Sequence, residues 1–252
     1  MYQFFVEAGQ IKESDRSVII TGSDVNHIKN VLRMRVGEEL SVSNGQDGKE
    51  YRCGIAAFEE NRIVCELRFI KEDNVELPAR VYLFQGLPKA DKMELIIQKA
   101  VELGVSGIIP VASRRCVVKL EEKKAAARRQ RWQGIAEAAA KQSRRGIIPE
   151  VCRVTDFREA VRMAAHMDVR LIPYELAEGM DKTRALIDGI RPGQSVAVFI
   201  GPEGGFEQEE ISLAAENGIE AITLGRRILR TETAGLAVLS WIGYALEGTV
   251  TG

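Results

Sequence analysis

Two short apolar runs near the C-terminus each end in a glycine-containing loop and then pass into a helical pattern. The first run, Val196 to Ile200, leads into Gly201-Pro202-Glu203-Gly204-Gly205-Phe206. The second, Ala221 to Leu224, leads into Gly-Arg-Arg-Ile-Leu-Arg-Thr-Glu-Thr-Ala at 225–234. Strand, loop and helix in this order form the repeating unit of a parallel α/β sheet, whose ligand sites lie at the carboxyl ends of the strands. The two loops therefore predict an α/β fold with a small-ligand site.

The same alternation extends upstream. Strand-like runs at Arg80 to Phe84, Gly107 to Pro110 and Arg170 to Ile172 alternate with helical patterns, the longest of them at Lys89 to Leu103 and Glu121 to Arg144. This alternation predicts a mostly parallel sheet with helices on both faces.

The first seventy or so residues follow a different pattern. Strand-like runs cover 16–21, 39–43, 51–58 and 62–70, and only 24–33 has helical spacing, with Asp24 as its expected N-cap. We therefore expect a small β-barrel with one helix. The polar stretch Lys71-Glu72-Asp73-Asn74 marks a boundary between a first domain, 1–73, and a second, 74–252.

Composition is ordinary for a soluble protein, at 45% hydrophobic and 28% charged residues. No apolar run approaches the length of a membrane span, and the N-terminus lacks a signal-peptide pattern, so we expect a cytoplasmic protein. The four cysteines are widely spaced, and no histidine lies near them at zinc-finger spacing. Free buried thiols and no metal site are the prediction.

Basic residues concentrate in one stretch although the net charge is only −1. From Pro110 to Arg153 there are twelve Lys and Arg against four Glu, an excess of eight. Such an excess suits a polyanion, and nucleic acid is one such partner. A solvated helix face is the alternative, because much of the excess falls between Lys123 and Arg131.

The two loops match neither of the common nucleotide-binding motifs. The G-x-G-x-x-G pattern is absent, and no Gly-Lys-Ser/Thr follows the glycines. Glycines let main-chain groups approach a flat ligand closely, and Pro202 stiffens the first turn. Apolar contact would come from four side chains, namely Ile200, Leu224, Ile228 and Leu229. This arrangement favours a purine and ribose over a phosphate chain.

Beyond these patterns, several motifs resemble those of the RsmE family. The strongest are Gly-Pro-Glu-Gly-Gly-Phe at 201–206 and Leu-Gly-x-Arg-Ile-Leu-Arg-Thr-Glu-Thr-Ala at 224–234. Weaker matches, in the same order as in the family, lie at 27–37, 89–105, 115–119, 131–132 and 139–145. The resemblance covers almost the whole chain.

The resemblance implies both a fold and an activity. The fold is that of the SPOUT superfamily, a parallel sheet with a C-terminal trefoil knot, preceded by a PUA-like β-barrel that binds RNA. The activity is methylation of N3 of one uridine in small-subunit (16S) ribosomal RNA, with S-adenosylmethionine as the methyl donor. The resemblance also implies a homodimer.

Three sets of site residues follow from the resemblance together with the chemistry of the side chains. Because N3 of uracil carries a proton, a cation near the uracil oxygens would stabilise the developing charge, and Arg230 lies inside the second loop. The catalytic candidates are Arg230, Glu232 and Arg145. The cofactor-binding candidates are Tyr174, Glu175, Ile200, Gly201, Pro202, Glu203, Gly205, Leu224, Gly225, Ile228, Leu229, Arg230, Thr233 and Ala234. The RNA-binding candidates are Arg33, Arg35, Lys92, Arg115, Lys119, Gln142 and Arg145.

Alternatives remain at the level of individual residues and of function. Arg230 could form an ion pair with Glu232 or Glu203 instead of facing a substrate. Glu232 could act as a base or only pair with an arginine. At the level of function, the alternatives are a SPOUT methyltransferase acting on another RNA base and a non-catalytic ribosome-assembly protein. Binding of S-adenosylmethionine distinguishes the last from an enzyme.

Overall fold

The computed structural model describes residues 1–72, 75–118, 121–177 and 179–247. They form two compact units, one of Met1–Glu76 with Ala140–Ile148 and the other of Leu77–Ala139 with Pro149–Gly252. The first unit thus includes the segment 140–148, which lies far along the chain from its other residues. Within the described part of the chain, no helix combines the length and apolar character that a bilayer crossing requires.

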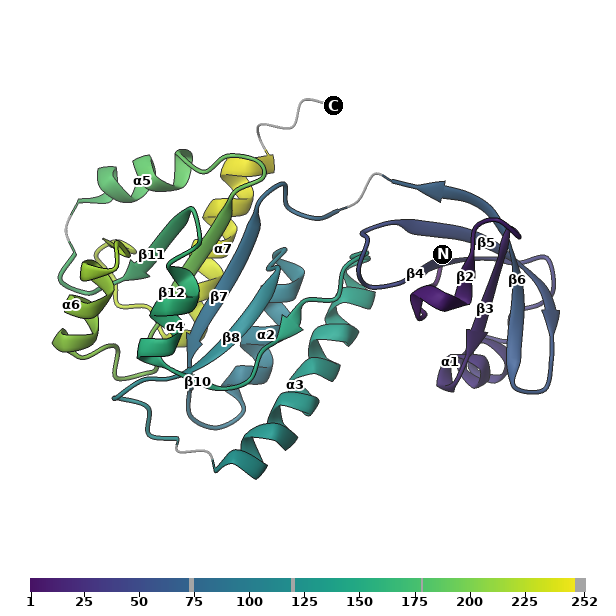
Figure 1. The fold of residues 1–252 in the computed structure, drawn as a ribbon, viewed down its shortest axis with the longest axis horizontal. Helices are drawn as coiled ribbons and strands as arrows, with labels where there is room; N and C mark the ends of the chain where they lie inside the picture. The colour runs from purple at the N-terminus through teal and green to yellow at the C-terminus, as the bar shows by residue number, and fades with distance from the viewer. Residues whose placement is uncertain (73–74, 119–120, 178, 248–252) are drawn as a thin grey trace. The chain divides into compact units, whose positions relative to one another are not determined.

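The N-terminal unit is a six-stranded sheet with short helical turns (Figure 1). Its strands follow the order β1-β4-β5-β6-β3-β2, antiparallel except for the β1–β4 pair. The strands are β1 (Gln3–Phe5), β2 (Ile11–Lys12), β3 (Ser17–Thr21), β4 (Glu39–Ser43), β5 (Glu50–Phe58) and β6 (Arg62–Lys71). The helical turns are η1 (Ala8–Gln10), α1 (Ser23–Asn26) and the π-helical η2 (His27–Val31). The long strands that the alternation predicts are all present.

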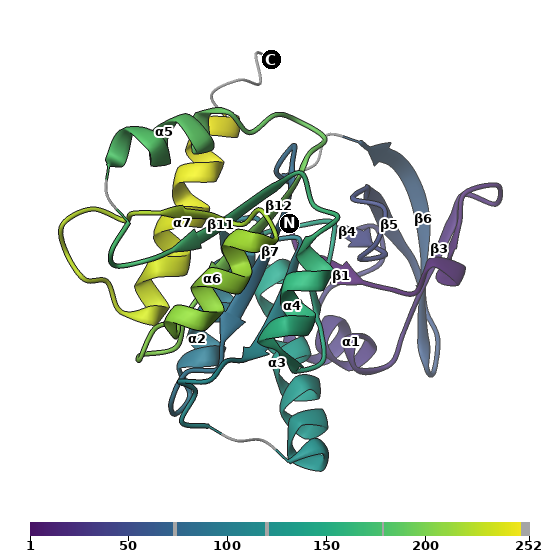
Figure 2. The same cartoon turned by 60° about the vertical axis from the view of Figure 1, so that its left-hand side comes forward.

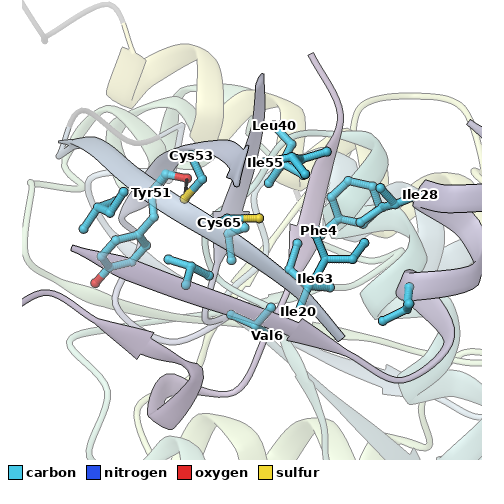
Figure 3. Close-up of a cluster of buried hydrophobic side chains, with 14 residues drawn as sticks. Phe4, Val6, Ile20, Ile28, Leu40, Tyr51, Cys53, Ile55, Ile63 and Cys65 are labelled. Carbon is cyan, nitrogen blue, oxygen red and sulfur yellow. Dashed lines mark hydrogen bonds between the residues drawn. The ribbon is translucent and has the colours of Figure 1, made fainter. Parts of the chain in front are cut away.

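Alternate residues of these strands form the core of the N-terminal unit (Figure 3). Phe4, Ile20 and Ile63 are almost completely buried there, in line with the two-residue period of a sheet with one apolar face. Cys53 and Cys65 lie in the same core as free thiols. Burial raises the pKa of each to about 12, so both are protonated at neutral pH.

The single helix of this unit differs in detail from the prediction. Asp24 is not its N-cap, because α1 begins after Gly22 and no side chain caps it. The carboxylate of Asp24 instead binds the ammonium of Lys141 at 3.2 Å. That ammonium also lies 4.6 Å from the centroid of the Phe4 ring. A tertiary ion pair has therefore replaced the local cap, and it fastens the segment 140–148 to this unit.

The C-terminal unit is a parallel sheet of seven strands in the order β10-β8-β7-β12-β11-β13, with β9 paired to β8. Figure 2 shows β7, β12 and β11 of this sheet. Its strands are β7 (Arg80–Gly86), β8 (Gly107–Ala112), β9 (Glu150–Val151), β10 (Thr155–Asp156), β11 (Val169–Pro173), β12 (Ser195–Ile200) and β13 (Glu220–Ile222). Its helices are α2 (Lys92–Glu102), α3 (Glu122–Gln142), α4 (Phe157–Ala164), α5 (Met180–Asp188), α6 (Gln208–Glu216) and α7 (Thr231–Glu247). Only the last residues of α3 belong to the N-terminal unit.

Helices cover both faces of this sheet, as the alternation predicts (Figure 1). On one face α4 and α6 pack over Phe84 and Phe199, whose rings stack with centroids 4.4 Å apart. On the other face α7 packs on β7 and β12 and against α2. The mixed α/β class with a parallel sheet is thus confirmed. The trefoil knot, which only the resemblance implies, stays a prediction.

Candidate active site

The candidate site lies where neighbouring parallel strands end. Ile200, the last residue of β12, pairs in register with Gln85 near the end of β7. Pro173, at the end of β11, pairs with Ile222 at the end of β13. Since parallel strands end at one edge of a sheet, the segments that follow them gather at that edge. Both loops singled out in the sequence therefore start from the same edge of the sheet.

The first loop, 201–206, is folded tightly against the end of β7. The N–H of Gly205 donates to the carbonyl of Pro202 at 2.9 Å, and Gly205 has a positive φ of 67°. A Cβ on Gly86 would lie only 2.6 Å from the backbone nitrogen of Pro202. Glycine at 86 is thus required for the close approach of the two backbones, a need that the sequence alone does not reveal.

A chain of buried hydrogen bonds joins this loop to the start of α7. The hydroxyl of Thr231 donates to the carbonyl of Gly201 at 2.6 Å and accepts from Nε2 of Gln85 at 2.9 Å. Nε2 of Gln85 also donates to the carbonyl of Gly86 at 3.0 Å. Gln85 is completely buried, and its Oε1 has no hydrogen-bond partner among the described residues. The first loop, β7 and α7 are therefore held together by one side-chain network.

An ionic contact joins the first loop and the start of α7 through a side chain of α2. The ammonium of Lys92 lies 3.0 Å from Oε1 of Glu203 and 3.2 Å from Oε2 of Glu232. The backbone N–H of Lys89 also donates to Glu203, at 3.1 Å. The hydrogen bond to Glu203 raises the pKa of Lys92. Burial opposes ionisation of Glu203, but backbone N–H groups and the Lys92 ammonium outweigh it and lower its pKa. Lys92 and Glu203 are thus both charged at neutral pH.

The second loop, 223–230, is open on its outer side. Gly225 has a φ of 96°, and a Cβ built on it would meet nothing within 4 Å. Ile228 exposes 84% of its surface, which is unusual for a large apolar side chain. The carbonyl of Arg230 accepts from the N–H groups of Thr233 and Ala234, so Arg230 lies at the start of α7. Backbone and apolar groups are thus accessible in this loop.

Arg230 itself exposes its side chain. Among the described residues it forms no side-chain hydrogen bond or ion pair, and both glutamates that could have paired with it are bound to Lys92 instead. The ion pair considered from the sequence is therefore not formed, and the guanidinium is left facing solvent.

The third predicted cofactor segment follows β11. The N–H of Tyr174 donates to the carbonyl of Ile222 at 3.0 Å, and its hydroxyl donates to Oε1 of Gln208 at 2.7 Å. Glu175 is exposed. Because Tyr174 continues the β11–β13 pairing, this segment lies beside the start of the second loop.

The predicted RNA-binding residues divide between the units. Arg33 and Arg35 are exposed in the N-terminal unit, and Arg33 has a positive φ of 53° at the turn that follows η2. Gln142 is also exposed there. In the C-terminal unit Arg115 binds Glu207 at 2.9 Å and donates to the carbonyl of Gly204 at 2.8 Å. Lys119 lies outside the described residues.

Arg145 lies in an environment that the sequence does not indicate. Its side chain is 3% exposed and binds Glu76, with Nε of Arg145 3.0 Å from Oε2. Its carbonyl accepts from Nε2 of Gln3 at 3.0 Å. Both partners belong to the N-terminal unit, whereas Arg230 and Glu232 belong to the other. Arg145 is thus buried within the N-terminal unit, and Arg230 and Glu232 lie two positions apart at the start of α7 in the other unit.

Comparison with known proteins agrees with this geometry. The family model described as an RNA methyltransferase domain matches residues 75–243, and one described as an RNA methyltransferase PUA domain matches 20–68. The curated Ribosomal RNA small subunit methyltransferase E of Bacillus subtilis (strain 168) is 38% identical, covering 98% of each chain.

Two solved structures with bound cofactor are also similar. Ribosomal RNA small subunit methyltransferase E from Neisseria gonorrhoeae, bound to S-adenosyl methionine, is 34% identical with a TM-score of 0.79, covering 95% of each chain. A Legionella pneumophila protein in complex with bound SAM is 33% identical with a TM-score of 0.76, covering 91% of this chain and 92% of the other.

Fold and site together define an RNA methyltransferase with an N-terminal PUA domain. Within that class, the chain belongs to the ribosomal RNA small subunit methyltransferase E family, the RsmE family of the sequence resemblance.

Proposed function

We propose that this protein uses S-adenosylmethionine to methylate N3 of one uridine in small-subunit ribosomal RNA. The observation that carries the proposal is the pair of linked loops at one sheet edge, in a chain 34% identical to a relative that binds S-adenosyl methionine. The name of that relative supports ribosomal RNA as the substrate. The choice of uridine N3 rests on the family resemblance.

The residues present fit the cofactor. Neither Gly205 nor Gly225 has any atom within 4 Å of the position a Cβ would occupy, so the backbone of both loops is open to a ligand. Exposed Ile228 supplies an apolar side chain in the second loop. We propose that Ile200 to Gly205, Leu224 to Ala234 and the Tyr174-Glu175 segment hold the adenosyl group. The bound cofactor supplies an electrophilic methyl group on a sulfonium.

The chain's own side chains provide the remaining chemistry. N3 of uracil must lose its proton, and negative charge then spreads onto the neighbouring carbonyl oxygens. The free guanidinium of Arg230 is suited to stabilise that charge, because no carboxylate among the described residues competes for it. Glu232, whose side chain is 20% exposed beside Lys92, is the carboxylate we propose as proton acceptor. For Arg145 its burial against Glu76 favours a structural role.

One experiment tests the activity directly. Modified nucleosides are mapped in ribosomal RNA from cells that lack this protein, and the purified protein is then added back with S-adenosylmethionine. We expect loss of one N3-methylated uridine and its restoration by the protein. Restoration of a different modified base would support the alternative of another RNA target. Failure to bind S-adenosylmethionine would support a non-catalytic role in ribosome assembly.

The setting of the reaction is part of the same proposal. The substrate is small-subunit ribosomal RNA, free or in the assembled subunit, and the reaction takes place in the cytoplasm.

We further propose that the protein acts as a homodimer. In the C-terminal unit, Tyr244 of α7 exposes 86% of its surface and Leu95 of α2 exposes 46%. Large apolar side chains exposed to this extent on α7 and α2 are the observation that favours a second copy of the chain.

A further inference from the structure

Lys92 stands in a position that local helix chemistry disfavours. It is the first residue of α2, where the partial positive charge of the helix dipole opposes a cation. The preceding turn is also strained, because Ala90 adopts a positive φ of 53°, which is uncommon for a residue with a Cβ. Two local preferences are therefore violated within three residues, at the edge of the candidate site.

The contacts of Lys92 offset both costs. Its ammonium lies 3.0 Å from the carboxylate of Glu203 in the first loop and 3.2 Å from that of Glu232 in the first turn of α7, which follows the second loop. The strained turn also directs the N–H of Lys89 at Glu203. The side chains of Lys92, Glu203 and Glu232 are only 27%, 27% and 20% exposed, so solvent screens their attraction less than on an open surface. Oε2 of Glu232 is itself buried, and the Lys92 ammonium is the cation that faces it.

We propose that Lys92 is a positioning residue, which holds the two loops at the separation that S-adenosylmethionine requires. It acts through Glu203 of the first loop and through Glu232 in the first turn of α7, directly after the second loop, and so fixes the Glu232 carboxylate beside the reaction site. This inference rests on the proposed function, since it takes the two loops as the cofactor site. It replaces the role in RNA binding that the sequence suggests for Lys92, because an RNA phosphate would compete with two carboxylates for one ammonium.

The test compares Lys92→Met and Lys92→Arg with wild type. Lys99→Met is the matched control, because Lys99 lies on the same helix and, among the residues that the structure describes, its ammonium pairs only with Glu102, at 2.8 Å. Calorimetry with S-adenosylmethionine as the probe should show about tenfold weaker binding for Lys92→Met, or roughly 1.4 kcal/mol. Lys92→Arg should restore most of the affinity, and Lys99→Met should leave it unchanged.

Two further readouts separate positioning from simple unfolding and from direct RNA binding. Hydrogen exchange should become faster at the amides of 203–205 and 232–234 in Lys92→Met, while the amides of β8 stay protected. The salt dependence of RNA binding should not change. Wild-type cofactor affinity in Lys92→Met, or a shallower salt dependence of its RNA affinity, would overturn the inference in favour of an interaction between Lys92 and an RNA phosphate.

A double-mutant cycle addresses the pairing itself. Lys92→Met and Glu232→Gln should be non-additive in cofactor affinity, because each removes the same contact. Additive effects would count against the pairing. If wild type itself bound no S-adenosylmethionine, the proposed function would fail, whereas faster exchange of both loops in Lys92→Met would still establish the link between them.

Discussion

At the scale of single residues, Arg230 and Thr231 are neighbours in sequence with opposite environments. The guanidinium of Arg230 faces solvent, whereas the hydroxyl of Thr231 is buried between Gln85 and Gly201. The side chain of Arg230 is therefore free to act on a ligand, whereas the side chain of Thr231 holds the first loop in place. Substitutions at the two positions should separate catalysis from stability.

Replacement of Arg230 by alanine should abolish methylation and leave the fold intact. The exposed side chain contributes no contact to the described structure, so the thermal midpoint and the affinity for S-adenosylmethionine should stay near wild type. Single-turnover assays with the RNA substrate measure the loss. Arg227→Ala, at another exposed arginine of the same loop, is the control. Near-normal turnover by Arg230→Ala would rule out a central role for this guanidinium.

Replacement of Thr231 by valine should have the opposite outcome, with lower stability. It removes the hydroxyl that donates to the carbonyl of Gly201 and leaves Nε2 of Gln85 with the carbonyl of Gly86 as acceptor, and an unsatisfied buried group costs about 1–3 kcal/mol. Urea unfolding measures the change in the free energy of unfolding. Thr231→Ser keeps the hydroxyl and should lie much closer to wild type. Equal stability of the two variants would show that the hydrogen bonds contribute little.

Part of this residue-level detail could be predicted from the sequence. Glycines and an arginine in loops after strands indicate a ligand site from residue type and position alone. Gln85 and Lys92 could not be assigned in the same way, because their partners Thr231 and Glu232 lie some 140 positions further along the chain. Contacts over such separations depend on the strand order, which periodicity does not determine.

At the scale of elements, hydrophobic periodicity predicted the long strands and most helices but missed the short ones. β9 and β10 have two residues each, too few to show a period. α4 has a clear apolar face of Phe157, Ala160, Val161 and Ala164, so its spacing was a signal present in the sequence. The attachment of the segment 140–148 to the N-terminal unit had no such signal, because it depends on Asp24, Gln3 and Glu76.

The ion pair of Arg145 with Glu76 should be the strongest single attachment of that segment. Removing one partner of a buried pair leaves an uncompensated charge, which costs about 3–5 kcal/mol. We therefore expect Arg145→Met to accelerate hydrogen exchange throughout β1 and β4. Arg144→Met, at the exposed neighbour, is the control. Combining Arg145→Met with Glu76→Leu should recover most of the protection, and failure to recover it would point to poorer packing instead.

At the scale of the whole molecule, composition and the change of period predicted two kinds of fold in one chain. Neither predicts how copies of the chain assemble, because that depends on which apolar side chains remain exposed.

The exposed Tyr244 and Leu95 suggest a dimer, so light scattering at micromolar concentration should give twice the mass of the chain. Tyr244→Glu should yield the monomer, because a carboxylate in an apolar interface lacks a partner. A monomeric wild type would contradict the dimer.

RNA binding should depend on the N-terminal unit through charge. Arg33 and Arg35 are exposed, and the left-handed conformation of Arg33 turns the chain sharply after η2, which presents both arginines on one short exposed segment. If an arginine neutralises one phosphate, removing its charge should reduce the slope of log affinity against log salt by roughly 0.7 for a single-stranded RNA.

We therefore expect a combined Arg33→Gln and Arg35→Gln variant to bind small-subunit ribosomal RNA more weakly and with a shallower salt slope, measured by fluorescence anisotropy from low to physiological salt. Arg62→Gln removes an exposed arginine of the same unit that pairs with Glu59 at 2.6 Å, so it controls for net charge. If Arg62→Gln, which removes one charge, shifted the slope half as much as the double variant, general charge rather than a defined interaction would account for binding. Affinity for S-adenosylmethionine should remain unchanged in both, because Arg33, Arg35 and Arg62 all lie in the N-terminal unit and the two cofactor loops in the other.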